Sequence, residues 1–238
     1  MQYFGLFVGE FTNWINKRLS NEQKVFSLDL FKEFKKEFSP NYILMISTSI
    51  IYIVILYRFG IGNGIIENLD LIKYLILTPM LLSVTVIDYK LQIIPNRLNL
   101  SLFEIGLVFS FIYGMSNPAI TINMLLGMFV GGGIFLGITL LGGLVYGKEA
   151  MGLGDVKLMG ALGLYFGVAN IILIALVSFL IGAILSIILL VTRIKKTDEY
   201  IPFGPFIVIA TFITIFVPQG IIISALLQIF TLGMYYKK

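Results

Sequence analysis

The stretch LMGALGLYFGVANIILIALVSFLIGAILSIILLVT occupies residues 158–192 and contains no charged side chain. At a rise of 1.5 Å per residue, one helix over this stretch would be about 52 Å long, whereas the hydrocarbon core of a bilayer is about 30 Å thick. The stretch is therefore too long for one ordinary crossing. We expect it to fold into two arms with a turn near Gly167–Asn170, because glycine and asparagine favour turns.

Further apolar runs lie on both sides of this stretch, at residues 41–57, 71–87, 98–113 and 121–146, and from residue 203 towards the C-terminus. Pro218-Gln219-Gly220 interrupts the last run. Because the membrane core has no water to bond backbone groups, such spans should be helices. The sequence therefore predicts an all-α polytopic membrane helix bundle of about eight transmembrane helices.

The composition excludes several kinds of chemistry. Hydrophobic residues make up 58% of the chain and charged residues only 13%, against about 25% charged residues in an average soluble domain. Cysteine and histidine are both absent, which rules out disulfides, thiol nucleophiles, imidazole catalysis and Cys/His zinc sites. Any hydrolysis must therefore use Asp, Glu, Lys, Ser, Thr or Tyr side chains.

Residues 1–40 are expected to form an N-terminal membrane segment and a short basic amphipathic loop, followed by a transmembrane domain at residues 41–238. Residues 1–15 are apolar but have no basic leading segment, so we do not expect a removable signal peptide. Apolar residues then recur every three or four positions, which fits either an interfacial helix or a small solvated loop domain: Val25, Leu28, Phe31, Phe34 and Phe38.

The basic residues predict the topology. Counting crossings places residues 17–40, Asp88, Asp155 and residues 193–196 on one face of the membrane. That face holds 13 of the 17 Lys and Arg residues, so the positive-inside rule makes it cytoplasmic. The same distribution explains the net charge of +4, and we therefore expect no nucleic-acid partner.

Two aspartates stand at the edges of apolar runs on this face. Asp88 ends one run and Asp155 opens another. Taken singly, each has an ordinary explanation, Asp88 as a boundary charge and Asp155 as a helix N-cap. Two carboxyl groups at matching depth on separate helices also suit acid-base hydrolysis, because neighbouring carboxylates share one proton while one of them activates water.

Residues 88–96 (DYKLQIIPN) and 152–157 (GLGDVK) resemble the type IV prepilin peptidases and the related archaeal preflagellin peptidases, which are G-x-G-D intramembrane aspartyl proteases. Pro202-Phe203-Gly204-Pro205 extends the resemblance. It implies that Asp88 and Asp155 are the catalytic pair. It also implies an endopeptidase in the inner membrane that removes the short basic leader from pilin or pseudopilin precursors at the cytoplasmic face.

The resemblance also implies a set of residues that shape the site or bind substrate: Gly152, Gly154, Lys157, Pro95, Asn96, Pro202, Gly204 and Pro205. Gly152 and Gly154 would shape the backbone around Asp155, since glycine permits unusual dihedral angles. Pro95 would stiffen the loop after Asp88 and end any helix there, although a plain turn explains this proline equally well. Lys157 is equally explained as a boundary lysine that reaches the lipid headgroups. Residues 5–13 (GLFVGEFTN) look like the opening motif of the family, but Glu10 stands where a small residue is usual.

Many bacterial members of the family carry two C-x-x-C pairs and also methylate the new N-terminus. Without cysteine, we expect a peptidase with no N-methyltransferase activity, no metal and no other cofactor. The expected partners are prepilin-like substrates and the lipid bilayer, and the oligomeric state is left open. The alternative function is a proton- or cation-coupled transporter or channel that uses Asp88 and Asp155.

Small-xxx-small glycine pairs are a further feature, typical of closely packed membrane helices. The sequence has four of them in and after the run at residues 121–146: Gly127/Gly131, Gly133/Gly137, Gly143/Gly147 and Gly163/Gly167.

Overall fold

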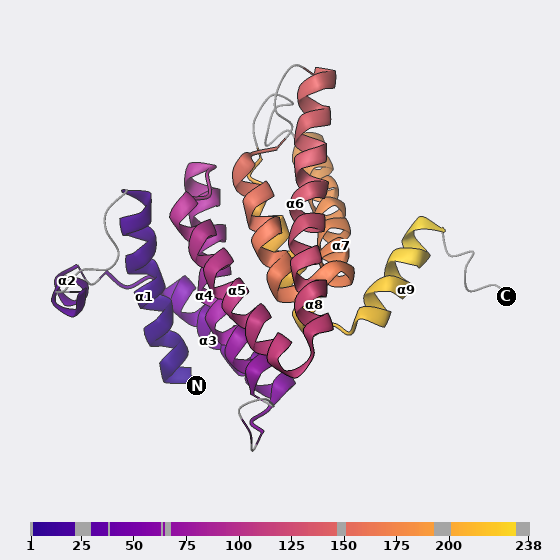
Figure 1. Ribbon diagram of the computed structural model, residues 1–238. Coiled ribbons are helices and arrows are strands. Elements are labelled where there is room, and N and C mark those ends of the chain that lie inside the picture. The colour runs from indigo at the N-terminus through magenta and orange to yellow at the C-terminus, as the bar shows by residue number, and fades with distance from the viewer. Residues whose placement is uncertain are drawn as a thin grey trace. The chain divides into compact units, whose positions relative to one another are not determined.

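In the computed structural model, which describes residues 2–21, 30–37, 39–62, 64, 68–146, 151–192 and 201–231, every regular element is an α-helix (Figure 1). The contacts divide the chain into two compact units, residues 1–104 and 105–238. The helices of the described residues are α1 (Gln2–Ser20), α2 (Leu30–Lys36), α3 (Tyr42–Phe59), α4 (Leu69–Leu91), α5 (Asn96–Ser116), α6 (Pro118–Tyr146), α7 (Leu153–Val191), α8 (Gly204–Phe216) and α9 (Gln219–Phe230).

Five of these helices, α3 to α7, are long and apolar enough to cross a membrane. The shorter apolar helices α8 and α9 are separated at Val217 and Pro218, at the predicted interruption. The prediction of an all-helical polytopic bundle is confirmed for the described residues. The count of about eight crossings and the domain boundary at residue 40 stay predictions.

In the first unit, α1 packs directly on α3 through two glycines. A Cβ atom added to Gly5 would lie 2.6 Å from the Cα atom of Ser49, and one added to Gly9 would lie 2.6 Å from the Cα atom of Met45. Since the residue numbers rise on one helix as they fall on the other, the two helices are antiparallel. The Tyr52 hydroxyl then joins α3 to α4 by donating to the Leu75 carbonyl at 2.8 Å.

An aromatic cluster holds α2 against α1. The Phe34 ring packs edge-on against Phe11 and Trp14, at centroid distances of 5.7 and 5.9 Å. Arg18 lies 4.7 Å above the Trp14 ring and binds Glu33 of α2 at 2.8 Å. Phe34 of the predicted amphipathic pattern thus contacts α1, whereas Val25, Leu28 and Phe38 lie outside the described residues.

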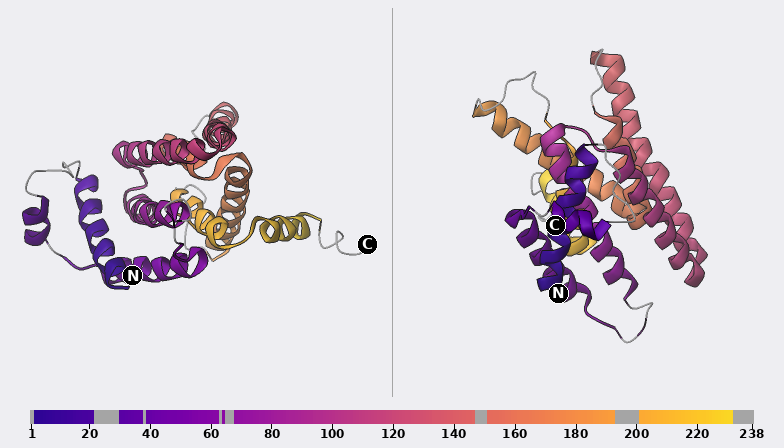
Figure 2. Two further views of the ribbon diagram at one scale, coloured as in Figure 1. Left: turned by 60° about the horizontal axis from the view of Figure 1, so that its bottom comes forward. Right: turned by 90° about the vertical axis from the view of Figure 1, so that its left-hand side faces the viewer.

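In the second unit, α7 is a hairpin of two arms rather than one straight helix. Gly167 has φ 70° and ψ −178°, a conformation open to glycine alone, and the Asn123 side-chain oxygen accepts the Val168 N–H at 3.3 Å beside it. Gly131 of α6 lies against both Met159 and Ile171, 12 residues apart. A straight helix would separate those two residues by about 18 Å, so the predicted turn is confirmed (Figure 2).

Glycines bring the first arm of α7, residues 153–166, into backbone contact with α6. A Cβ atom on Gly163 would overlap the Gly127 carbonyl, and one on Gly131 would lie 2.5 Å from the Met159 oxygen. Both faces of this contact therefore exclude any larger side chain. Two of the four predicted glycine pairs form it, whereas Gly133, Gly137 and Gly143 would meet nothing within 4 Å, and Gly147 lies outside the described residues.

Candidate active site

Asp88 occupies the last turn of α4 and is only 3% exposed. Its carbonyl accepts the N–H of Gln92 at 2.8 Å, and Gln92 takes the left-handed conformation that ends the helix. The helix therefore stops at Leu91, ahead of Pro95. Pro95 instead starts α5, because its carbonyl accepts the first helical N–H groups, including that of Leu98 at 3.0 Å. The prediction that Pro95 ends the helix after Asp88 is thus corrected.

Asp155 is the third residue of α7 and is 4% exposed. Gly152 is the N-cap, and its carbonyl accepts the Asp155 N–H at 3.0 Å. Asp155 is therefore inside the first turn and is not the N-cap itself. At this end of a helix, the unpaired N–H groups and the macrodipole favour negative charge.

The backbone around Asp155 is regular. Gly152 has φ −71° and ψ 144°, extended angles that any residue adopts, and Gly154 lies within the helix. Among the described glycines, only Gly60 and Gly167 have a positive φ. The expectation of unusual dihedral angles at Gly152 and Gly154 is therefore wrong. In α7 such angles occur at its turn, at Gly167.

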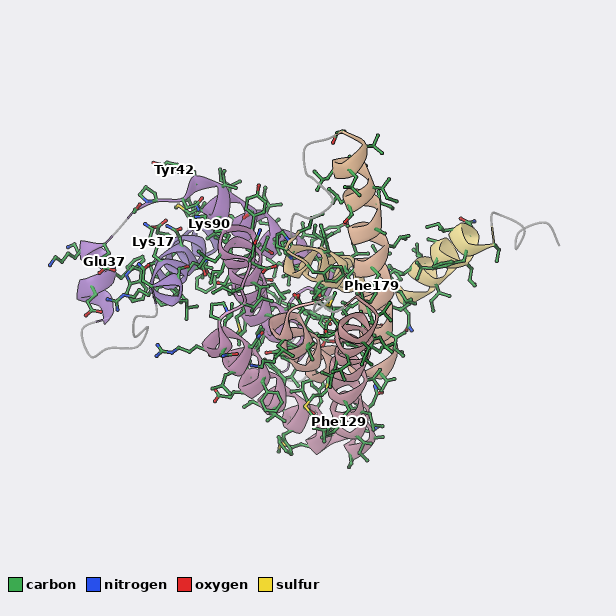
Figure 3. All side chains as sticks on the ribbon, turned by 90° about the horizontal axis from the view of Figure 1, so that it is seen from above. Lys17, Glu37, Tyr42, Lys90, Phe129 and Phe179 are labelled. Atoms are coloured by element: carbon green, nitrogen blue, oxygen red, sulfur yellow. The ribbon has the colours of Figure 1, made fainter. Side chains whose placement is uncertain are left out.

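A pocket of about 450 Å³ lies at the end of the first unit that carries Asp88. Leu91, one turn beyond Asp88, is part of its wall, and so are the predicted site residues Pro95 and Asn96. The full lining is Leu19, Ser20, Leu91, Ile93, Ile94, Pro95, Asn96 and Arg97. The C-terminal ends of α1 and α4 therefore meet there, and Figure 3 labels Lys17 and Lys90 on these two ends, on the same side of the first unit.

The remaining predicted site residues belong to the second unit. Lys157 is exposed two residues after Asp155. Pro202 and Gly204 are buried at the entry to α8, and Pro205 is its second residue, where a proline without an N–H is well tolerated.

The structure thus places Asp88 in the last turn of α4, with Pro95 and Asn96 in the wall of the pocket that follows this helix. Asp155 and its flanking glycines lie together in the second unit. The pairing of Asp88 with Asp155 stays a prediction. In the part of the chain that the structure describes, no group of three or more acidic side chains is placed to hold a metal ion. Phe203 belongs to the segment Pro202–Pro205 that carries the resemblance, but it is not among the predicted site residues, because the contacts of an aromatic side chain cannot be read from an apolar sequence.

Comparison with known proteins adds evidence on the family. The profile of the type IV leader peptidase family matches residues 75–187. A prepilin leader peptidase/N-methyltransferase of Xanthomonas campestris is 35% identical over 172 residues, which are 71% of this chain and 56% of the relative. Proteins of the same name from Aeromonas hydrophila and Pseudomonas aeruginosa are 35% and 38% identical over 142 and 141 residues, 59% of this chain and 48% of each relative.

The chain thus spans about half the length of the curated relatives it matches. No solved structure matches it. The profile match includes both Asp88 and Asp155 and most of α4 to α7. Over residues 75–187, the chain belongs to the type IV leader peptidase family.

Proposed function

We propose that this protein is an intramembrane aspartyl endopeptidase that removes the short leader from prepilin-like precursors. The observation that carries the proposal is a pair of buried carboxyl groups, Asp88 in the last turn of α4 and Asp155 in the first turn of α7, both inside the segment that matches the family. Three relatives named as prepilin leader peptidases support the substrate class.

The two carboxyl groups occupy electrostatically opposite helix ends. Asp155 lies at the N-terminal end of α7, where the macrodipole favours an anion, and Asp88 lies at the C-terminal end of α4, where it does not. In the proposed mechanism Asp155 is therefore the ionised partner and Asp88 carries the shared proton.

The reaction follows from this assignment. Asp155 takes a proton from a water molecule, whose oxygen attacks the scissile carbonyl carbon, while Asp88 gives its proton to the carbonyl oxygen. When the tetrahedral intermediate collapses, the C–N bond breaks and Asp155 returns its proton to the leaving amine. In the same step Asp88 takes back the proton of one hydroxyl group of the intermediate, which restores the shared proton. The new carboxyl end of the leader and the new amine of the mature protein then leave.

We place the active face at the cytoplasmic side of the inner membrane. Exposed cations at the Asp88 end of the first unit, Lys17 and Lys90, support this orientation. The transporter alternative gains no support from the three relatives, which carry peptidase names. Methyl transfer, which those names also include, is not part of the proposal.

The deciding experiment is a cleavage assay with the purified protein in liposomes and a synthetic precursor peptide that has a basic leader and an apolar helix. Mass spectrometry should find one cut that releases the leader, with Asp88→Asn and Asp155→Asn inactive. An intact peptide with the wild-type protein would refute the proposal. Cleavage by Asp88→Asn or Asp155→Asn at the wild-type rate would also refute it. A proton flux across the same liposomes that needs both aspartates would instead establish the transporter.

A further inference from the structure

Four phenylalanines of the second unit form one cluster around the entry to α8. The Phe203 ring lies 5.9 Å from Phe135 of α6, 5.3 Å from Phe179 of α7 and 5.6 Å from Phe206, centre to centre. Phe135 and Phe179 also stack on each other at 5.1 Å; Phe179 is labelled in Figure 3. The cluster therefore ties the turn Pro202–Pro205 to two helices.

Gly182 of α7 provides the space for this contact. A Cβ atom at this position would lie 3.0 Å from Cε2 of Phe203 and 3.1 Å from Cδ2 of Phe206. These distances are tighter than ordinary van der Waals contact, so the two rings rest on the bare backbone of Gly182. Direct packing thus fixes the position along α7 at which the turn Pro202–Pro205 lies.

The register between α6 and α7 shows where the phenylalanine cluster lies relative to Asp155 along the axis of α6, and we call this position its level. Gly131 lies beside Met159 of the first arm and Ile171 of the second. One helical turn further along α6 is Phe135, and the same step along the antiparallel first arm leads from Met159 to Asp155. Phe135 and Asp155 are therefore at one level within the second unit.

The turn Pro202–Pro205 consequently begins at the level of Asp155, since Phe203 touches Phe135 there. Phe203 also touches Gly182, further along the second arm of α7. A substrate bond at the Asp155 carboxyl must lie within about 3 Å of it. An extended chain advances about 3.4 Å per residue, so the substrate residues next to the cut lie close to the level of the turn.

We propose that Phe203 is a positioning residue for substrate, which holds the turn Pro202–Pro205 as a wall of the substrate path beside Asp155. This inference rests on the peptidase reaction proposed above. Asp155 itself is held independently of the cluster, through the glycine contacts of its arm with α6. Loss of the Phe203 ring should therefore weaken substrate binding and leave the chemical step in place.

The test compares Phe203→Ala with two matched variants in the leader-cleavage assay. Phe203→Ala should raise KM about tenfold with kcat changed less than about twofold, and Phe203→Leu should restore most of the binding because it refills the cluster. Phe212→Ala is the control, because Phe212 is also half-buried on α8 but stacks on Phe216, away from the cluster. An unchanged KM for Phe203→Ala, or a loss of kcat together with a lower unfolding temperature, would overturn the inference.

Glycine variants give a second test. Gly182→Ala should raise KM about threefold by displacing the ring, whereas Gly133→Ala, whose Cβ would meet nothing within 4 Å, should not. Binding of a fluorescent precursor peptide to Asp155→Asn, with and without Phe203→Ala, measures the same effect without catalysis. Weaker binding with Phe203→Ala supports the inference even if the cleavage mechanism is wrong, and equal binding refutes it even if cleavage proceeds as proposed.

Discussion

The carboxylate of Glu10, buried within α1, accepts the backbone N–H of Asn41 at 3.0 Å, where α3 begins. Its second oxygen accepts the N–H of Ser39 at 3.3 Å. The neighbouring Asn13 side chain donates to the Ser39 carbonyl at 2.8 Å. One turn of α1 thus satisfies the backbone that enters α3, and this explains why a glutamate is buried in α1.

Replacing Glu10 by glutamine should destabilise the first unit. Glutamine keeps one acceptor oxygen, but its NH2 group would face a backbone N–H donor, so one of the two bonds is lost. Hydrogen bonds to a charged group contribute about 1.5–3 kcal/mol each, and we expect a loss of about that size in the free energy of unfolding, measured by denaturant titration in detergent. Glu104→Gln, at an exposed position of α5, is the control; equal stability of the two variants would contradict this role of Glu10.

A second buried charge lies near the start of α4. The Lys73 ammonium, in a side chain only 5% exposed, binds the Asp70 carboxylate at 2.7 Å and lies 4.5 Å from the centre of the Tyr74 ring. Asp70→Asn removes the anion that this ammonium contacts. Because Asp70 is half exposed, we expect a loss of about 1–3 kcal/mol, between the values for exposed and buried pairs.

Adding Lys73→Met to Asp70→Asn should recover most of that stability, since an apolar replacement of a buried pair is often neutral. Cleavage should be normal in both variants, because Lys73 lies 15 residues, or about 22 Å, before Asp88 on α4. Unfolding temperature and cleavage rate are the two measurements. A double variant less stable than Asp70→Asn alone would contradict the pairing.

The turn of α7 could be predicted from the sequence, because an uncharged stretch longer than a membrane crossing must break and Gly167 is the residue that permits it. The positions of the aspartates at helix ends followed in the same way from the edges of the apolar runs. Both predictions rest on local features, chain length and charge, which hold whatever the tertiary arrangement.

Contacts between distant segments could not be predicted. Spacing places Gly133 and Gly137 on one face of α6 as surely as Gly127 and Gly131, yet only the second pair meets another helix. Similarly, nothing in the sequence marks Glu10 as the acceptor for Asn41, 31 residues away. The helix end after Asp88 was assigned to Pro95 because proline is a strong local signal, whereas Gln92 ends the helix in a conformation that its residue type rarely adopts.

The glycine contact between α6 and α7 gives a third prediction. Gly163→Ala places a methyl group against the Gly127 carbonyl, and neither backbone can give way as a flexible side chain would. The arm that carries Asp155 should move away from α6, with a loss of about 1–3 kcal/mol in the free energy of unfolding and a marked loss of cleavage. Gly137→Ala should be at least as stable as the wild type, since alanine favours the helix and meets nothing within 4 Å. Equal behaviour of the two variants would show that the contact is not tight.

The last prediction concerns the two aspartates as one acid-base unit. If they share a proton, removing either carboxyl group leaves the other without its partner, so Asp88→Asn and Asp155→Asn should each lower kcat at least about 100-fold. The double variant should then be little worse than either single one, because residues that act as a unit are strongly non-additive. Glu104→Gln, which removes an exposed carboxylate of α5, should cleave normally. The measurement is leader release by the four variants at equal folded amounts, followed from pH 4 to 9, and the pH profile of the wild type should be a bell whose limbs belong to the pair. Effects that multiply in the double variant would mean that Asp88 and Asp155 act in separate steps, and the shared-proton mechanism would have to be abandoned.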